Sequence, residues 1–352
     1  MSLEQRRTAM EFTNDVARRD FLKVIGAGGL TLGAGSILTA CQQTASTTTG
    51  SSNPPVNTND EYVYLSIVTQ VPFWVDHKAA LNDFGKATSV KTSFVGPPDF
   101  NVQGQATQLD QIVSRKPAGI VIFIGDADAM TPGINRAVDA GIPVILVISD
   151  APKSKRTAYI GIDGYLAGRS GAARLAEAIG GRGKVAVGSF PSPNVLDRAR
   201  GYKDYFTEHG VQVVAEVNDE ADPSKAPSKY AAAIAAHPDL VAIAGCDGDS
   251  GLGAARAVIE AGKKGQIKIM AMDRNDDMLA KVEDGTILGS VVQKSYDEMW
   301  LACWMLFWLN HNVLKPVPDW RAAAINPLPE QIITGVWPLT KQNVAQFKHK
   351  SA

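Results

Sequence analysis

The chain has 352 residues, of which 45% are hydrophobic and 20% charged, which is typical of a soluble globular protein with two ordinary domains. Its formal net charge is only −1, so the composition gives no reason to expect nucleic acid or an anionic surface as a partner. We therefore expect no nucleic-acid partner.

Two export signals follow one another at the start of the chain. Arg18-Arg19-Asp20-Phe21-Leu22-Lys23 resembles the twin-arginine export signal, an address read by a receptor. A charge-free stretch then ends in Leu38-Thr39-Ala40-Cys41, which resembles a bacterial lipobox with Cys41 as the lipidated residue. Four glycines within 26–33 would weaken a buried helix, so we interpret 1–41 as a cleavable signal peptide rather than as part of a cytosolic domain.

Residues 42–60 are rich in Ser and Thr and almost free of apolar side chains, which predicts a flexible tether. From residue 62 onward, short β-rich runs alternate with amphipathic stretches. This alternation predicts a parallel sheet flanked by helices. The predicted strands are 63–68, 91–95, 119–124 and 143–148, and the predicted helices include 73–86 and 132–140, the last with Pro132 in its first turn.

The same alternation begins again after a junction near 159–164. The fold class is therefore α/β, with two units of similar size. A strand at 287–292 is long enough to cross back to the first unit, and a last short strand is predicted at 332–334. The other predicted strands are 184–189, 212–217, 240–244 and 267–272, and the helices are 166–179, 198–209, 223–237, 251–261 and 294–310.

The motifs of common enzymes are missing. The chain has no G-x-x-x-x-G-K-[ST] phosphate loop, no H-E-x-x-H, no G-x-S-x-G and no C-x-x-C. Its five histidines have no partner at metal-ligand spacing. We therefore predict no cofactor, no metal site and no enzymatic activity.

Polar and aromatic side chains stand where the predicted strands end, and ligands of open α/β sheets bind at these ends. A single Asp there is more often a helix cap or turn former, an arginine is often solvated, and Trp74 could belong to the core. Together, however, carboxylates, a guanidinium and aromatic rings suit a polyhydroxylated ligand. The predicted ligand-binding residues are Phe73, Trp74, Ser149, Asp150, Arg198, Asp247, Asp273 and Gln293.

From about Tyr62 to Leu339 the chain resembles the type I periplasmic binding proteins, in the branch that binds ribose and related sugars. The resemblance is carried by Pro72-Phe73-Trp74, Asp150-Ala151-Pro152, Tyr159-Ile160-Gly161-Ile162-Asp163, Arg198-Ala199-Arg200-Gly201-Tyr202 and Met272-Asp273. It implies two Rossmann-like lobes with parallel sheets, joined by a three-strand hinge and closing over a ligand in the cleft. It also implies a first lobe of 62–162 plus 294–325 and a second lobe of 163–293 plus 326–345.

The chain departs from the pattern of that family at three positions. Ile148 stands where many relatives have an acidic residue, Val71 replaces a common Asn, and Asp247 stands where Asn is frequent. These departures predict a ligand with fewer hydroxyls facing the first lobe than ribose offers, such as a deoxysugar or a furanone-like signal.

The resemblance implies a monomeric, extracytoplasmic and lipid-anchored receptor that passes a small sugar-like ligand to the permease subunits of an ABC importer. The alternative is a sensory receptor for a sugar-like signal, coupled to a kinase or chemoreceptor. A lactose-repressor-type regulator would need a helix-turn-helix before the core, and an enzyme would need a nucleophile or base constellation; neither pattern is present.

Two questions about the core stay open in the sequence. Cys246 and Cys303 could form a disulfide, but two free buried thiols are at least as well supported, since twin-arginine substrates usually fold before export. The apolar run 299–309 is too short to span a membrane. We expect it to pack in the core, the alternative being an aromatic surface for a permease or a second copy.

Overall fold

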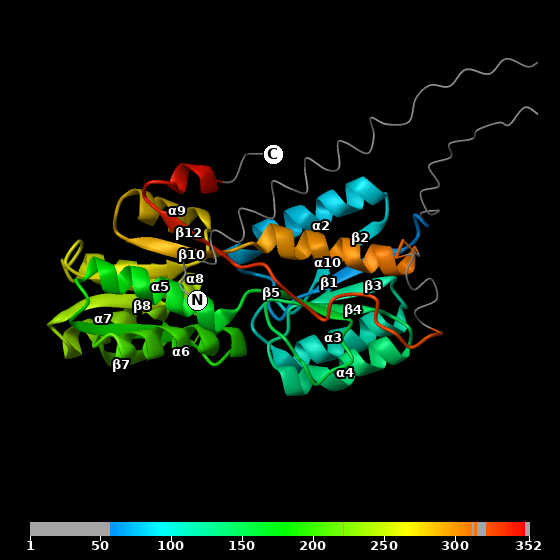
Figure 1. Cartoon of the computed structure of the whole chain (residues 1–352), viewed down its shortest axis with the longest axis horizontal. Helices are drawn as coiled ribbons and strands as arrows, with labels where there is room; N and C mark the ends of the chain where they lie inside the picture. The colour runs from blue at the N-terminus through cyan, green and yellow to red at the C-terminus, as the bar shows by residue number, and fades with distance from the viewer. Residues whose placement is uncertain (1–56, 221, 312, 315–321, 349–352) are drawn as a thin grey trace, which may run out of the picture. The chain divides into compact units, whose positions relative to one another are not determined.

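The computed structural model describes residues 57–220, 222–311, 313–314 and 322–348. The predicted signal peptide with Cys41, and the tether as far as residue 56, lie outside the described residues. The described chain forms two six-stranded sheets with helices on their faces (Figure 1). In this part of the chain no helix is both long and apolar enough to cross a membrane.

The first sheet is entirely parallel and has the order β11-β5-β4-β3-β1-β2. Helices α2 (Val75–Thr88) and α10 (Ser295–Asn310) pack on one face, while α3 (Val102–Ser114) and α4 (Ala127–Asp139) pack on the other (Figure 1). Buried Val, Ile and Leu side chains on both faces form two core layers. The strands are β1 (Glu61–Leu65), β2 (Lys91–Val95), β3 (Gly119–Ile122), β4 (Val144–Val147), β5 (Ala158–Gly161) and β11 (Gln331–Ile333).

The second sheet has the order β12-β10-β9-β8-β6-β7, and only β12 is antiparallel to its neighbour among the described strands. Its helices are α5 (Gly164–Ala178), α6 (Pro193–Glu208), α7 (Ala226–Ala236), α8 (Gly248–Glu260) and α9 (Asp276–Glu283). Its strands are β6 (Lys184–Ser189), β7 (Gln212–Asn218), β8 (Leu240–Gly245), β9 (Lys268–Met272), β10 (Gly289–Gln293) and β12 (Val336–Thr340).

Three connections join the sheets: β5 to α5, β10 to α10, and β11 to β12. The Thr334 hydroxyl lies at this hinge, 3.1 Å from the Gly161 carbonyl oxygen and 3.1 Å from Oε1 of Glu298. The predicted α/β class, with two parallel-dominant lobes and a three-strand hinge, is therefore confirmed.

Some details of the chain path differ from the sequence prediction. Residues 326–345 were assigned to the second lobe, but β11 pairs with β5 of the first sheet and only β12 joins the second. The helix predicted to start at Pro132 starts at Ala127, because the Asp126 side chain accepts from the Ala129 N–H at 2.7 Å and caps it there. Pro132 lies inside this helix.

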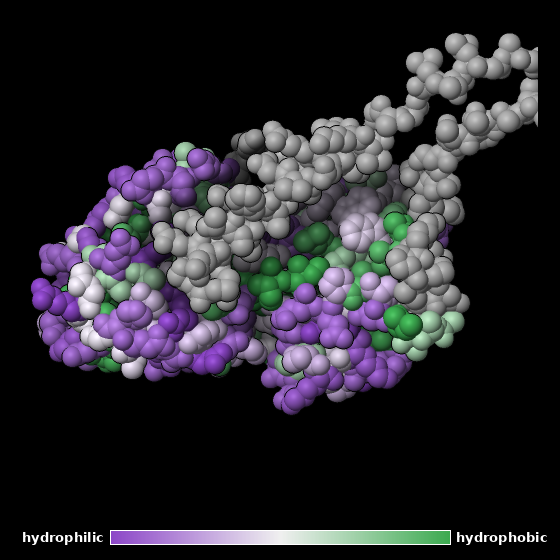
Figure 2. Space-filling view, in the orientation of Figure 1, coloured by the Kyte–Doolittle hydropathy of each residue, from purple (hydrophilic) through white to green (hydrophobic). Residues whose placement is uncertain are grey.

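The two open questions about the core have structural answers. Cys246 and Cys303 are both buried and free, and they belong to the cores of different lobes. Helix α10 packs against α2 and the first sheet, with Met299, Cys303 and Leu306 buried. Figure 2 shows a visible face that is largely hydrophilic over α6 and α4, with hydrophobic residues gathered on the first lobe.

Candidate functional site

A cavity of about 570 Å³ lies between the two lobes, at the carboxyl ends of the strands in both sheets. This volume is in the range of small-molecule binding sites. Both lobes contribute to its walls. Six of the predicted ligand-binding residues line it: Phe73, Trp74, Arg198, Asp247, Asp273 and Gln293.

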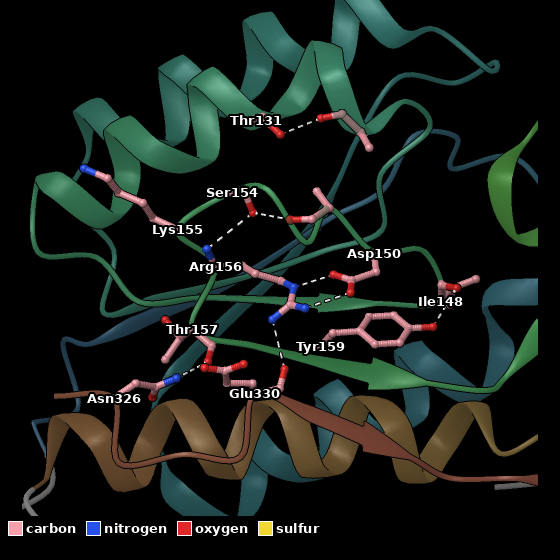
Figure 3. Close-up of polar contacts among 12 residues, drawn as sticks. Thr131, Ile148, Asp150, Ser154, Lys155, Arg156, Thr157, Tyr159, Asn326 and Glu330 are labelled. Atoms are coloured by element: carbon pink, nitrogen blue, oxygen red, sulfur yellow. Dashed lines mark hydrogen bonds and ion pairs between the residues drawn. The ribbon is translucent and has the colours of Figure 1, made fainter.

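Ser149 and Asp150 lie elsewhere. Arg156 forms an ion pair with the Asp150 carboxylate, including a 2.7 Å bond from Nη2 to Oδ2, and it also donates to the Glu330 carbonyl oxygen at 2.9 Å (Figure 3). Arg156 thus ties Asp150, in the loop after β4, to the segment before β11. The Ser149 side chain is 2% exposed and does not line the cavity. Because β4 ends at Val147, Ile148 takes the position that faces the cavity.

The first-lobe wall is apolar and aromatic. Phe73 and Trp74 belong to a short 3₁₀ helix that starts at Pro72, whose fixed φ suits that first position. Trp74 contacts Phe123 and the buried His77, with ring centroids 5.5 Å and 5.4 Å apart. Burial lowers the pKa of His77 to about 3, so this side chain is neutral and adds no charge behind the wall.

The second-lobe wall is a hydrogen-bonded polar array. Arg198, in the second turn of α6, donates from Nη1 to the Cys246 carbonyl oxygen at 3.1 Å and from Nη2 to Oε1 of Gln293 at 3.0 Å. Gln293 Nε2 in turn donates to Oδ1 of Asp273 at 2.9 Å. Asp247 caps α8 by accepting from the Ser250 N–H and hydroxyl, both at 2.8 Å, so its capping and cavity roles coexist.

Asp249, which is not among the predicted ligand-binding residues, also lines this wall. Burial, and then the neighbouring Asp247 and Asp273, raise the pKa of Asp249 to about 6. Burial also raises the pKa of Asp273 to about 6, against the opposing effect of Arg198, and raises the pKa of Asp247. The string Asp247-Gly248-Asp249 directly follows β8 and was the available signal.

Ile148 and Asp273 occupy corresponding places in the two lobes. Each is the first residue after a central strand, and their φ angles are +68° and +70°. This left-handed region is a true outlier for a β-branched residue, with a cost of about 1–3 kcal/mol. The same backbone position therefore presents an apolar side chain in the first lobe and a carboxylate in the second.

The lobes also contact each other beside the cavity. Arg274 donates to the Asp76 carboxylate through Nε at 3.0 Å and Nη2 at 2.5 Å, and its Nη1 reaches the Phe347 carbonyl oxygen at 2.6 Å. The Phe100 and Phe190 rings meet edge to face at 6.3 Å. The Asp76–Arg274 and Phe100–Phe190 contacts join residues of opposite lobes, so the structure is that of a closed cleft.

Comparison with known proteins decides the family. The profile described as "Periplasmic binding protein domain" matches residues 62–309. The chain belongs to the periplasmic binding protein family. The "Xylitol-binding protein" of Mycolicibacterium smegmatis is 22% identical over 280 residues, covering 78% of this chain and 76% of the relative. The "Ribose import binding protein RbsB" of Bacillus subtilis is 24% identical over 241 residues, covering 68% and 78%.

Solved structures of this family agree. AraP, an arabinose binding protein from Geobacillus stearothermophilus, has 29% identity and a TM-score of 0.72, and the match covers 83% of this chain and all of AraP (100%). A solute binding protein from Burkholderia graminis, solved with D-arabinose, has 26% identity and a TM-score of 0.76, covering 83% and 99%. The chain thus falls in the sugar-binding branch of the periplasmic binding proteins. It is an extracytoplasmic binding protein and not an enzyme.

The hinge of this periplasmic binding protein holds a buried acid. Glu298 is 0% exposed, and Oε2 has no hydrogen-bond partner among the described residues. Burial raises the pKa of Glu298 from 4.5 to about 7, against a smaller lowering by Thr334 and Arg198. A raised carboxyl pKa contributes stability that is complete below pH ~4.5 and is lost as the pH rises through about 7.

We therefore expect the stability of Glu298→Gln, measured relative to that of the native protein, to rise by about 2 kcal/mol from pH 5 to pH 8. The gain arises because glutamine has no proton to lose at the hinge. Urea unfolding at the two pH values measures it, with Asp297→Asn on the exposed side of the same helix turn as control. An equal effect of Glu298→Gln at both pH values would contradict the assignment.

Proposed function

We propose that this protein captures a small sugar or sugar-like molecule outside the cytoplasm and passes it to the permease of an ABC importer, as a monomer held to a membrane by lipidated Cys41. The main support is the contrast between Ile148 and Asp273 at corresponding places in the cavity. Carboxylate, amide and guanidinium groups on the second lobe pair with hydroxyls, while the aromatic first-lobe wall suits a C–H face. The ligand therefore has few hydroxyls toward the first lobe, as in a deoxysugar.

Clamshell closure follows from this division of the site. A ligand that touches both walls binds the closed form better than the open form, and this difference shifts the hinge equilibrium. The ion pair between Asp76 and Arg274 forms only when the lobes approach, so it adds to the stability of the closed form. The permease then has a distinct ligand-bound shape to recognise.

The test is thermal unfolding of residues 42–352 with pentoses, hexoses, deoxysugars, polyols and furanones. A ligand at a hundredfold excess over its dissociation constant adds about 2.7 kcal/mol, which raises the Tm by several degrees. We expect deoxysugars to give larger shifts than their parent sugars. Sub-micromolar ribose binding in calorimetry would contradict the hydroxyl-poor face, and no shift with any compound would contradict a sugar receptor.

The variant Ile148→Asp sharpens this test. Asp tolerates a left-handed conformation better than Ile, and its carboxylate adds a hydroxyl acceptor to the first-lobe wall. We expect this variant to bind the fully hydroxylated parent sugar at least about tenfold better than the native protein does, because one charged hydrogen bond contributes about 1.5–3 kcal/mol. Ile148→Asn, which adds no charge, is the matched control.

A further inference from the structure

The second-lobe wall of the cavity carries negative charge that the described residues do not neutralise. Asp247, Asp249 and Asp273 all line it, and none has a Lys, Arg or His nitrogen within 4.0 Å in the described parts of the chain. Three other acidic residues of the cavity are paired, while a fourth, Asp99, is exposed. Asp76 is bonded to Arg274, Glu220 to Lys225 and Lys229, and Asp222 to Lys225.

Arg198 does not supply the missing charge by direct contact. Two of its nitrogens donate to neutral acceptors, the Cys246 carbonyl and the Gln293 amide oxygen. Its Nε, and Nε1 of Trp74 across the cavity, are buried donors with no acceptor among the described residues. Arg198 and Trp74 are 2% and 1% exposed. The cavity thus presents carboxylates that lack a cation and buried donors that lack an oxygen.

We propose that the ligand is a small polyhydroxylated amine, an amino-deoxy sugar or amino polyol. Its ammonium group lies among Asp247, Asp249 and Asp273, and its oxygens accept from Arg198 and Trp74. The inference rests on the proposed sugar-receptor function and names the ligand class of that same cavity. One such molecule supplies both a cation for the carboxylates and oxygen acceptors for the buried donors.

Other ligand classes fit less well. A neutral sugar would leave three carboxylates opposite one guanidinium in a closed cleft, where desolvation is costly. A phosphorylated or carboxylated sugar would be repelled by them. A metal ion is not supported either, because no group of three or more His, Cys, Asp or Glu side chains in the described chain is placed to hold one.

The ionisation of the carboxyls on the second-lobe wall agrees with a positively charged ligand. The carboxyls of Asp249 and Asp273 have pKa values of about 6. These two carboxyls interact with each other, and the other charged groups that act on one or both of them are Asp247, Arg198 of α6, Asp222 of the loop after β7 and Asp76 of the first lobe. Asp249 and Asp273 are mostly ionised at pH 7.5 and mostly protonated at pH 5. An ammonium ligand stabilises the ionised forms, so its affinity should fall as the pH is lowered, whereas a neutral sugar has no such preference.

The experiment is titration calorimetry of residues 42–352 with matched compounds. Each set holds an amine, its N-acetyl form and its hydroxyl form, such as glucosamine, N-acetylglucosamine and glucose, their galactose counterparts, and glucamine with sorbitol. We expect at least one amine to bind tenfold or more tighter than both of its neutral forms at pH 7.5, and this ratio to shrink at least fivefold at pH 5. Neutral forms that bind as tightly as the amine would overturn the inference and leave the sugar receptor intact. If no compound of either kind binds, both are overturned.

A pair of variants locates the charge. Asp249→Asn keeps the shape of the side chain and removes its charge, so it should weaken the amine at least tenfold and its neutral forms less than twofold. Asp277→Asn is the control, because Asp277 is an exposed carboxylate in the first turn of α9 that does not line the cavity. It should change the binding of the amine and of its neutral forms by less than twofold. Equal losses for amine and neutral forms in Asp249→Asn would contradict the inference.

Discussion

Asp273→Gly should weaken ligand binding by about 30- to 1,000-fold, since a buried charged acceptor contributes about 2–4 kcal/mol. The carboxylate holds Gln293 and, through it, Arg198, and it lines the cavity directly. Glycine accepts the +70° φ of this position without strain, so the fold should survive. Titration calorimetry with the best ligand of the panel gives the binding constant, and urea unfolding checks that stability changes by no more than about 1 kcal/mol.

Two further variants separate backbone strain from binding. Asp273→Ala should lose binding to the same degree and also about 1 kcal/mol of stability, because alanine is strained at positive φ. Asp277→Ala, an exposed acid in the first turn of α9, should change binding less than twofold. Ligand binding by Asp273→Gly within threefold of the native value would remove Asp273 from the site.

The periodicity of the chain was enough to predict the two α/β lobes, because strands buried on both faces read as unbroken apolar runs. The order of the last strands was not accessible in this way. Gln331–Ile333 and Val336–Thr340 are short, lie on either side of Thr334 and Gly335, and join different sheets. Nothing in their own pattern tells which sheet each one extends, since that is decided by the hinge path.

Two of the predicted residues reach the cavity from different kinds of element: Asp273 directly follows β9, and Arg198 lies in the second turn of α6. Asp150 does not line the cavity, and the strand-end rule could not show this, because it does not tell how many residues pass before the chain turns away. Its partner Arg156, six positions later, holds it in the loop. Asp249 was missed because an acid in the first turn of a helix is ordinarily explained by the helix dipole.

The close crossing of α5 and α6 supports a second prediction with a large effect. A Cβ on Gly168 would lie 2.1 Å from the Arg198 carbonyl oxygen, and a Cβ on Gly201 would lie 2.2 Å from the Tyr165 carbonyl oxygen. Both contacts are with backbone atoms, so no rotamer change can relieve them. We expect Gly168→Ala to push α6 away from α5, with a loss of about 3 kcal/mol or more and a Tm lower by roughly 6–12 °C.

This displacement should also reach the ligand. The backbone of Arg198 in α6 packs against Gly168. The hydrogen bonds from the Arg198 guanidinium to Gln293 and to the Cys246 carbonyl therefore depend on the position of α6. Gly168→Ala should therefore weaken binding at temperatures well below its Tm, although Gly168 does not line the cavity. Gly248→Ala is the control for stability, because its Cβ would meet no atom closer than 3.7 Å and should change the unfolding free energy by less than about 0.5 kcal/mol. If Gly168→Ala were as stable as the native protein, α5 and α6 could separate without loss of unfolding free energy. The close packing of these two helices would then not be what positions Arg198.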